Sequence, residues 1–178
     1  MRISLLIKKT MTLLHVVKYP DPILKKKCLP VTKWDDALQT LLDNMLDTMY
    51  ADDGMGLAAN QVAISKRIFI MDEDHEKKSP LFFINPEIVF ESEAQVSEEE
   101  GCLSFPGIRV AVLRPHTVVV KAFDRHGKEF LCEREGYPAR CLLHEYDHLE
   151  GITFFDRISA LKRQMAEKKL AKLRHTAM

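Results

Sequence analysis

Cysteine is scarce in this 178-residue chain, and its four cysteines stand far apart, at Cys28, Cys102, Cys132 and Cys141. Small proteins that need disulfides to fold carry many closely spaced cysteines, whereas a chain of this length can form a sufficient hydrophobic core without them. The sequence therefore excludes a disulfide scaffold. We expect four reduced thiols and a cytoplasmic protein.

An excess of charge is also absent, because 26 basic and 26 acidic residues give a formal net charge of +0. The whole chain therefore has no field that would attract DNA. Long apolar runs are missing as well. The apolar run at residues 3–7 is too short for the core of a signal peptide or for a membrane span, so we expect no membrane partner.

The first ten residues precede any clear pattern, and a second methionine, Met11, stands where the patterned sequence begins. We expect residues 1–11 to form a disordered extension, with Met1 and Met11 both open as the start of translation. The rest of the chain has the length of one domain with a short tail.

The first predicted helix spans residues 34–50. Its apolar residues recur at the spacing that places them on one face, which indicates core packing. Thr32 and Asp35 resemble a capping box at its start, and Gly54 and Gly56 break the periodicity after its end. The apolar residues are Leu38, Leu41, Leu42, Met45, Leu46 and Met49.

Strand-like runs follow, and residues 125–127 predict a hairpin turn between the last two. A second helix is predicted at residues 138–149, with Pro138 in its first turn and Gly151 just past its end. Ser159 caps a last helix that runs to about residue 173. Without regular strand–helix alternation, we predict an α+β fold of mostly antiparallel sheets packed around the second helix, with a C-terminal helix. The predicted strands are residues 67–71, 81–90, 108–113, 117–123 and 129–132.

The second helix carries the sequence H-E-Y-D-H at residues 144–148, which has the form H-E-x-x-H. Residues four apart on a helix lie one above the other, about 6 Å apart, so two imidazoles can bind one metal ion. Glu145 lies about 100° around the helix, where it can face the open side of the ion. The pattern predicts a metal site, against the alternative of two surface histidines and a solvated acid.

Two histidines leave a tetrahedral site incomplete, so a third ligand is needed. Cys141 lies seven residues from His148, about 10 Å along the helix, which is too far for convergence. Phe154 stands where one zinc-protease class has its third histidine, which excludes that class. Glu167 stands near the position of a glutamate ligand in another class; its basic neighbours favour a solvated salt bridge, and it stays a second candidate.

Cys102 is the stronger candidate for the third ligand. It lies in a polar segment, residues 98–104, where a structural cysteine has little reason to be. Gly101 beside it would let the backbone approach a ligand closely. On these grounds alone, an ordinary loop cysteine explains the sequence equally well.

Three segments, in chain order, resemble the signature motifs of bacterial peptide deformylases. They are G-M-G-L-A-A-N-Q at residues 54–61, E-G-C-L-S at residues 100–104 and H-E-Y-D-H at residues 144–148. The resemblance extends from about residue 11 to residue 161. One departure is Leu143, because the family usually has glutamine immediately before H-E-x-x-H.

The resemblance implies an enzyme that hydrolyses the formyl group from the N-terminal formylmethionine of newly made polypeptides and releases formate. It implies a single catalytic domain at residues 12–160 and metal ligands at Cys102, His144 and His148. It also implies one divalent ion, with iron(II) favoured in the cell and zinc, nickel or cobalt compatible with the same ligands.

The resemblance further assigns the catalytic acid and base to Glu145. The amide of Gln61 and the backbone N–H of Leu103 would polarise the formyl oxygen. Such groups are suited to activating a water and to stabilising an oxyanion.

A peptide substrate also suits the two glycine-bearing segments. An extended peptide could pair with the backbone near Met55, Gly56 and Gly101, as a strand added to an edge. The methionine side chain would need an apolar pocket, to which Tyr137 and Cys141 could contribute. Plain core packing is the alternative for these last two residues.

The C-terminal segment, residues 161–178, is expected to be a basic helix. It suits docking on ribosomal RNA near the exit tunnel, as the resemblance suggests, and a solvated helix face is the alternative. Its basic residues include Lys162, Arg163, Lys168, Lys169, Lys172 and Arg174.

Two other functions remain open from the sequence. A metallo-endopeptidase would cleave internal peptide bonds, but this chain lacks the usual third ligands of that class. A non-catalytic Cys/His₂ module would close its site with a fourth protein ligand and would not need Glu145.

Overall fold

The computed structural model describes residues 12–74 and 79–176; the extension predicted for residues 1–11 lies outside this part of the chain. Three α-helices, α1 (Asp36–Ala51), α2 (Gly136–Leu149) and α3 (Ala160–Thr176), accompany seven strands. The strands are β1 (Gly56–Ala58), β2 (Ile68–Met71), β3 (Leu81–Glu91), β4 (Gln95–Gly101), β5 (Arg109–Pro115), β6 (Thr117–Phe123) and β7 (Glu129–Glu135).

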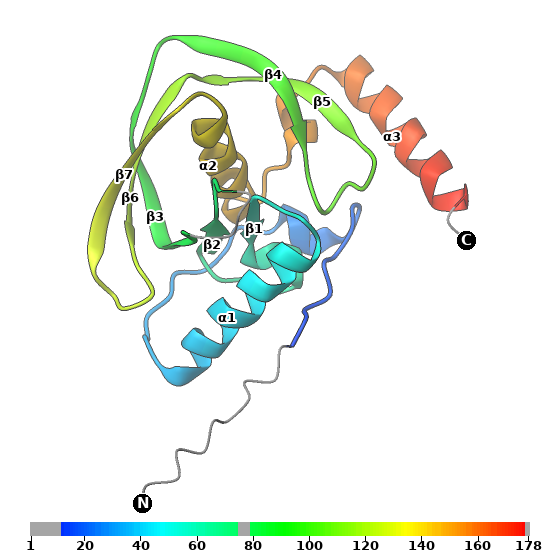
Figure 1. Cartoon of the computed structure of the whole chain (residues 1–178). Coiled ribbons are helices and arrows are strands. Elements are labelled where there is room, and N and C mark those ends of the chain that lie inside the picture. Colours follow the sequence, from blue (N-terminus) through cyan, green and yellow to red (C-terminus); the bar gives the residue numbers. More distant parts are fainter. Residues whose placement is uncertain (1–11, 75–78, 177–178) are drawn as a thin grey trace, which may run out of the picture.

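Two antiparallel sheets surround α2 (Figure 1). One sheet has five strands in the order β1-β2-β3-β6-β7, and the other consists of β4 and β5. Helix α2 contacts β1, β2, β6 and β7 of the larger sheet and β5 of the smaller one. The predicted α+β architecture with a central H-E-x-x-H helix and a C-terminal helix is therefore confirmed.

Helix α1 covers one part of the core with the predicted apolar face. Its buried members include Leu38, Leu42, Met45 and Met49, which pack with residues of β1, β2 and β3. The helix begins two residues later than predicted because Asp35, rather than Thr32, is the cap: its carboxylate accepts a hydrogen bond from the N–H of Leu38.

Helix α2 packs its inner face on the core beneath the five-stranded sheet, where Ala139, Leu142 and Leu143 are buried. Gly151 follows its end with φ +72°, in the left-handed region that favours glycine. A Cβ atom there would lie 2.5 Å from the carbonyl oxygen of Lys25. The cap glycine therefore also lets the N-terminal segment pass close beneath the end of the helix.

Strand β4 was not predicted from the sequence. Residues 98–104 were described as a polar segment with no predicted strand, whereas the structure has a strand that ends at Gly101, immediately before Cys102. Apolar alternation is weak in this strand because its side chains are mostly exposed, and the residue that it buries is Glu100, a charged one. Periodicity therefore could not identify it.

Helix α3 packs on the rest of the molecule along one narrow stripe. Ala166 and Leu170 are buried in a cluster that includes Phe105 and Ile108, from the segment between β4 and β5. The hydroxyl of Tyr19 donates a 2.8 Å hydrogen bond to Glu167. Among the described residues, no helix has both the length and the apolar character needed to cross a membrane.

Candidate metal centre and active site

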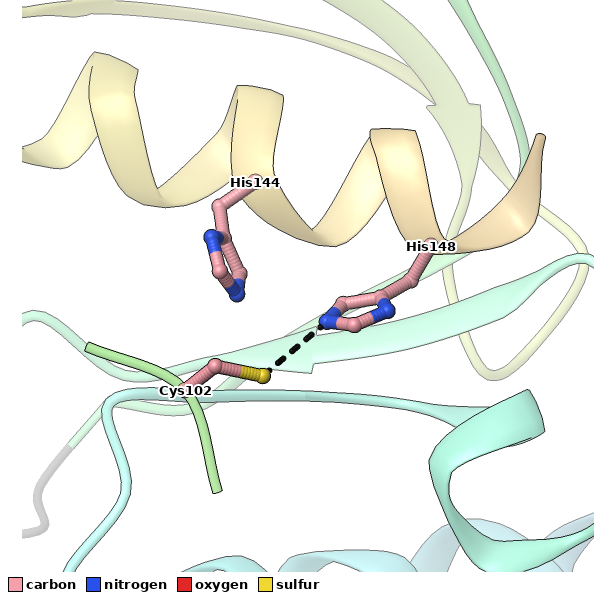
Figure 2. Close-up of side chains that lie close together, drawn as sticks. All are labelled: Cys102, His144 and His148. Carbon is pink, nitrogen blue, oxygen red and sulfur yellow. Dashed lines mark hydrogen bonds between the residues drawn. The ribbon is translucent and has the colours of Figure 1, made fainter. Parts of the chain in front are cut away.

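Cys102, His144 and His148 converge from two elements (Figure 2). Cys102 directly follows β4, and both histidines project from α2. The Sγ atom of Cys102 lies 3.3 Å from the Nε2 atom of His148, and the potential ligand atoms of the three residues all lie within 4.8 Å of one another. In the described part of the chain, this is the one group with such a geometry.

The three side chains fit a divalent ion. With bonds of about 2.0–2.3 Å, tetrahedral coordination separates ligand atoms by roughly 3.3–3.8 Å, which agrees with the separation of Cys102 and His148. Burial lowers the pKa of His148 well below its usual range, so this imidazole is neutral, as a ligand must be. Burial also lowers the pKa of His144, but Cys102 and Glu100 outweigh burial and raise that pKa. The groups around this imidazole therefore stabilise a positive charge in the site.

The two other ligand candidates lie outside this group. Cys141 is partly buried on α2 and lines the adjoining cleft, in agreement with the argument from helix rise. The carboxylate of Glu167 accepts hydrogen bonds from Tyr19 and from the Nε atom of Arg163, which gives it the salt-bridge role that its neighbours indicated.

Glu145 lies beside the ligands with an oxygen available for a proton. Its side chain is buried, and its Oε2 atom has no hydrogen-bond partner among the described residues. Burial raises the pKa of this carboxyl to about 7, a value suited to a group that takes and returns a proton near neutral pH. Gly56 packs directly against it, since an added Cβ would lie 2.5 Å from Oε1.

Gln61 is held in one orientation by its neighbours. Its Oε1 atom accepts a 2.8 Å hydrogen bond from the N–H of Ala58, which turns the NH₂ group the other way. That NH₂ group donates to Ser104 Oγ at 3.2 Å and to Cys102 Sγ at 3.4 Å. The amide therefore presents its donor hydrogens beside the candidate metal site.

Leu103 lines the site together with Gln61 and Glu145. The ammonium group of Lys18 donates a 2.8 Å hydrogen bond to its carbonyl oxygen, and its side chain would contact a Cβ atom on Gly54. These contacts fix the peptide segment that includes the N–H of Leu103.

A cleft of about 730 Å³ opens onto the site. It brings together every residue that the sequence suggested for catalysis or substrate binding, as well as two of the three candidate ligands. These are Met55, Gly56, Gln61, Gly101, Cys102, Leu103, Tyr137, Cys141, His144 and Glu145.

A buried ionic network behind the cleft was not predicted. Glu100 accepts from His144 Nδ1 at 2.9 Å and from two nitrogens of Arg114, at 2.5 and 2.9 Å. Arg114 also donates to Asp147 at 2.7 Å. Burial raises the pKa of Glu100, but the hydrogen bonds of Arg114 and His144 outweigh it and hold that pKa well below its usual range. The carboxylate therefore stays charged and directs Nε2 of His144 toward the site.

Only weak sequence signals pointed to this network. Asp147 lies inside the H-E-x-x-H motif, and Glu100 begins the E-G-C-L-S segment. Arg114 lies near the end of a predicted strand, where one basic residue has no special meaning. Leu143, the departure from the usual glutamine, is buried in the apolar cluster beneath α2.

The Cys/His₂ group on an H-E-x-x-H helix, with a buried carboxylate at its side and a cleft before it, defines a mononuclear metallo-hydrolase. The polypeptide deformylase model matches residues 13–164, and the chain belongs to this family. It is therefore a metal-dependent hydrolase that removes the formyl group from the formylmethionine of newly made polypeptides.

Named relatives extend over nearly the whole chain. The peptide deformylase of Saccharophagus degradans is 46% identical over 162 residues, which is 91% of this chain and 94% of the relative. Peptide deformylase 1 of Shewanella oneidensis is 47% identical over 91% of this chain and 96% of the relative. The crystal structure of a peptide deformylase from Legionella pneumophila superposes with a TM-score of 0.90 at 43% identity, covering 93% of this chain and 98% of that one.

Proposed function

We propose that Cys102, His144 and His148 hold the divalent ion and that Glu145 is the catalytic acid and base of deformylation. The observation that carries the proposal is the convergence of three ligand atoms beside a buried carboxylate whose Oε2 atom has no partner among the described residues. A closed structural site would instead need a fourth protein ligand.

When bound, the ion supplies a Lewis acid that lowers the pKa of a coordinated water toward neutrality. Glu145 accepts a proton from the attacking water and returns it to the nitrogen of the leaving peptide, so that formate and a free amine result. Its burial keeps the carboxyl pKa near 7, so both transfers are accessible near neutral pH.

Negative charge develops on the formyl oxygen as the water attacks. The NH₂ group of Gln61 and the backbone N–H of Leu103 are the donors that we assign to this oxygen. Each such donor contributes about 3 kcal/mol to the stabilisation of the transition state when it is well placed. The hydrogen bonds of Ala58 and Ser104 fix the Gln61 amide before the substrate arrives, so little reorganisation is needed.

The substrate peptide lies, in this proposal, along the backbone of Met55, Gly56 and Gly101. Gly56 in β1 and Gly101 in β4 line the same cleft, as does Met55, the residue before β1. The methionine side chain enters the part of the cleft near Tyr137 and Cys141, at the start of α2. Backbone pairing would bind diverse peptides, while the side pocket would select methionine.

Formate release from formyl-Met-Ala-Ser tests the assignment. We compare the wild-type protein with Glu145→Gln, which preserves volume, at matched metal loading. The wild-type protein should release formate, and the variant should be at least 100-fold slower with unchanged metal content. Equal turnover by both proteins would contradict the role of Glu145, and no release by metal-loaded wild type would contradict the proposed site.

For the metal itself we propose iron(II) in the cell. One thiolate and two imidazoles are compatible with iron(II), zinc, nickel and cobalt, and family resemblance favours iron. Elemental analysis of protein purified without oxygen should find iron at one equivalent, replaced by zinc after exposure to air. Zinc alone in active protein purified without oxygen would contradict this choice.

For α3 we propose docking on ribosomal RNA in the cytoplasm. Lys162, Lys168, Lys169 and Lys172 are exposed on this helix, whereas Ala166 and Leu170 anchor it to the cluster beside the cleft. Deleting the helix would expose that apolar cluster to solvent, so the test changes the charge of the helix and keeps the helix itself. Replacing the four lysines with glutamine should leave formate release unchanged and weaken salt-sensitive ribosome binding by 10-fold or more. Unchanged binding would remove the docking role.

A further inference from the structure

Arg140 is a buried arginine on α2 that the proposed mechanism does not use. Its side chain is 4% exposed, and it lies four residues before His144, on the same side of the helix. Burying a guanidinium group is unfavourable unless most of its N–H groups are paired. Its partners therefore indicate its role.

One set of partners belongs to the backbone of the smaller sheet. Arg140 Nη2 donates to the carbonyl oxygen of Val96 in β4 at 2.7 Å, and Nη1 donates to that of Val112 in β5 at 2.8 Å. A two-stranded sheet has marginal stability by itself and needs packing from another element. Arg140 ties both strands to α2.

The other partner is the carboxylate that orients a candidate ligand. Arg140 Nη1 donates to Glu100 Oε1 at 2.8 Å, while Glu100 Oε2 accepts from His144 Nδ1 at 2.9 Å. Arg114 also donates to this carboxylate, through Nε to Oε1 and through Nη2 to Oε2. Two guanidinium groups thus hold the carboxylate of Glu100 in one orientation. If this carboxylate could rotate, the imidazole of His144 would lose the hydrogen bond that orients it.

We propose that Arg140 is a positioning residue of this enzyme, which keeps the ligand-bearing ends of β4 and α2 at the separation that one metal ion needs. The inference rests on the metal site proposed above. Arg140 acts on His144 through Glu100, and on Cys102 through β4, whose last residue precedes that cysteine. It contacts neither the ion nor the reacting atoms in this role.

Lysine is a poor substitute at this position. The guanidinium reaches Val96, Val112 and Glu100 with two nitrogens in one plane, whereas an ammonium group is a single point charge on a flexible stem. Lysine retains the charge opposite Glu100 but not the simultaneous contact with both strands. Arg140→Lys should therefore have an effect between those of the wild type and Arg140→Met.

Nickel affinity, measured by competition with a chelator, tests the proposal without depending on turnover. Arg140→Met should raise the dissociation constant of nickel by about 10- to 100-fold, the usual effect of losing a group that orients a ligand. Arg140→Lys should raise it less. Val120→Ala, in the apolar core of β6, is the control, because it should lower the melting temperature without changing nickel affinity.

A double-mutant cycle identifies the route of the effect. If Arg140 acts largely through Glu100, then Arg140→Met should change nickel affinity less in a Glu100→Gln background than in the wild type. Arg140→Lys takes the place of Arg140→Met in the cycle should the latter fail to fold.

Nickel affinity within twofold of wild type for both Arg140 variants would overturn the inference. An equal loss of affinity in Val120→Ala would also overturn it, because general destabilisation would then be the cause. A different result, in which Cys102→Ala binds nickel as tightly as the wild type, would show that the metal site itself is wrongly assigned and would remove the inference with it.

Discussion

A Cβ atom added to Gly56 would lie 2.5 Å from the Oε1 atom of Glu145, closer than two such atoms approach without a bond. Because Gly56 has no side chain, the carboxylate of Glu145 can lie directly against β1. Glu145 is buried and its Cγ and Cδ atoms would also be within 2.8 Å, so it cannot simply rotate away.

Gly56→Ala should therefore displace Glu145 and reduce kcat/KM by about 100-fold, as a shift of about 1 Å in a catalytic group does. Metal content should not change, because the three atoms nearest to the added Cβ all belong to Glu145 and not to a candidate ligand. The loss of stability caused by Gly56→Ala should disappear in a Glu145→Ala background. An equal loss in both backgrounds would locate the strain elsewhere.

Metal removal should lower the stability of the protein through the three candidate ligands. An ion present at 100 times its dissociation constant raises the free energy of unfolding by about 2.7 kcal/mol. Chemical unfolding with and without nickel should show this gain in wild type and in Cys141→Ala, and lose it in Cys102→Ala. Loss of the gain in Cys141→Ala would mean that the helix cysteine is a ligand after all.

Gln61→Leu should lower kcat by about 10²- to 10³-fold at full metal loading, because an oxyanion donor is lost. Ser104→Ala removes only the hydroxyl that holds the amide at 3.2 Å, and should lower kcat by a smaller factor. Steady-state kinetics on a formyl-Met tripeptide measure both. A larger loss of kcat in Ser104→Ala than in Gln61→Leu would contradict the assignment of Gln61 as the oxyanion donor.

Leu143→Gln should lower the free energy of unfolding by about 1–3 kcal/mol, since an amide would enter an apolar cluster. Leu143→Met, which nearly conserves volume, should have an effect below about 1.5 kcal/mol. We also expect Leu143→Gln to alter hydrogen bonding around the metal. Unchanged stability, metal content and kcat/KM in this variant would contradict that expectation.

Asp156 should make part of the stability depend on pH. Burial raises the pKa of this carboxyl, but hydrogen bonds from Lys25 and Thr153 outweigh it and lower the pKa below its ordinary value. The stabilisation is therefore fully present above the ordinary pKa of about 3.9 and is lost as the pH falls through the folded value.

The difference in unfolding free energy between wild type and Asp156→Asn should accordingly be at most about 1 kcal/mol at pH 7 and should shrink at acid pH. Loss of metal at low pH affects both proteins and cancels in the difference. Glu93→Gln, at an exposed position, provides the matched control. A difference that grows as the pH falls would contradict the assignment.

The helices were predicted from the sequence more accurately than the strands. The apolar face of α1 and the Gly151 cap of α2 follow from local periodicity and backbone freedom, and both were predicted. The exposed strand β4 was missed, because its side chains mostly face solvent and carry no alternating apolar signal. Its partner β5 extends two residues beyond the predicted end, to Pro115.

The two histidines of H-E-x-x-H could be assigned without the structure, because helical spacing alone brings His144 and His148 within reach of one ion and rules out Cys141. Motif resemblance then supplied Cys102 and Gln61. The buried network of Glu100, Arg114 and Arg140 could be found only in the folded protein, because these residues are 14 to 40 positions apart in the chain. A buried charge is stable only beside its partners, and that pairing depends on how β4, β5 and α2 pack rather than on any local pattern.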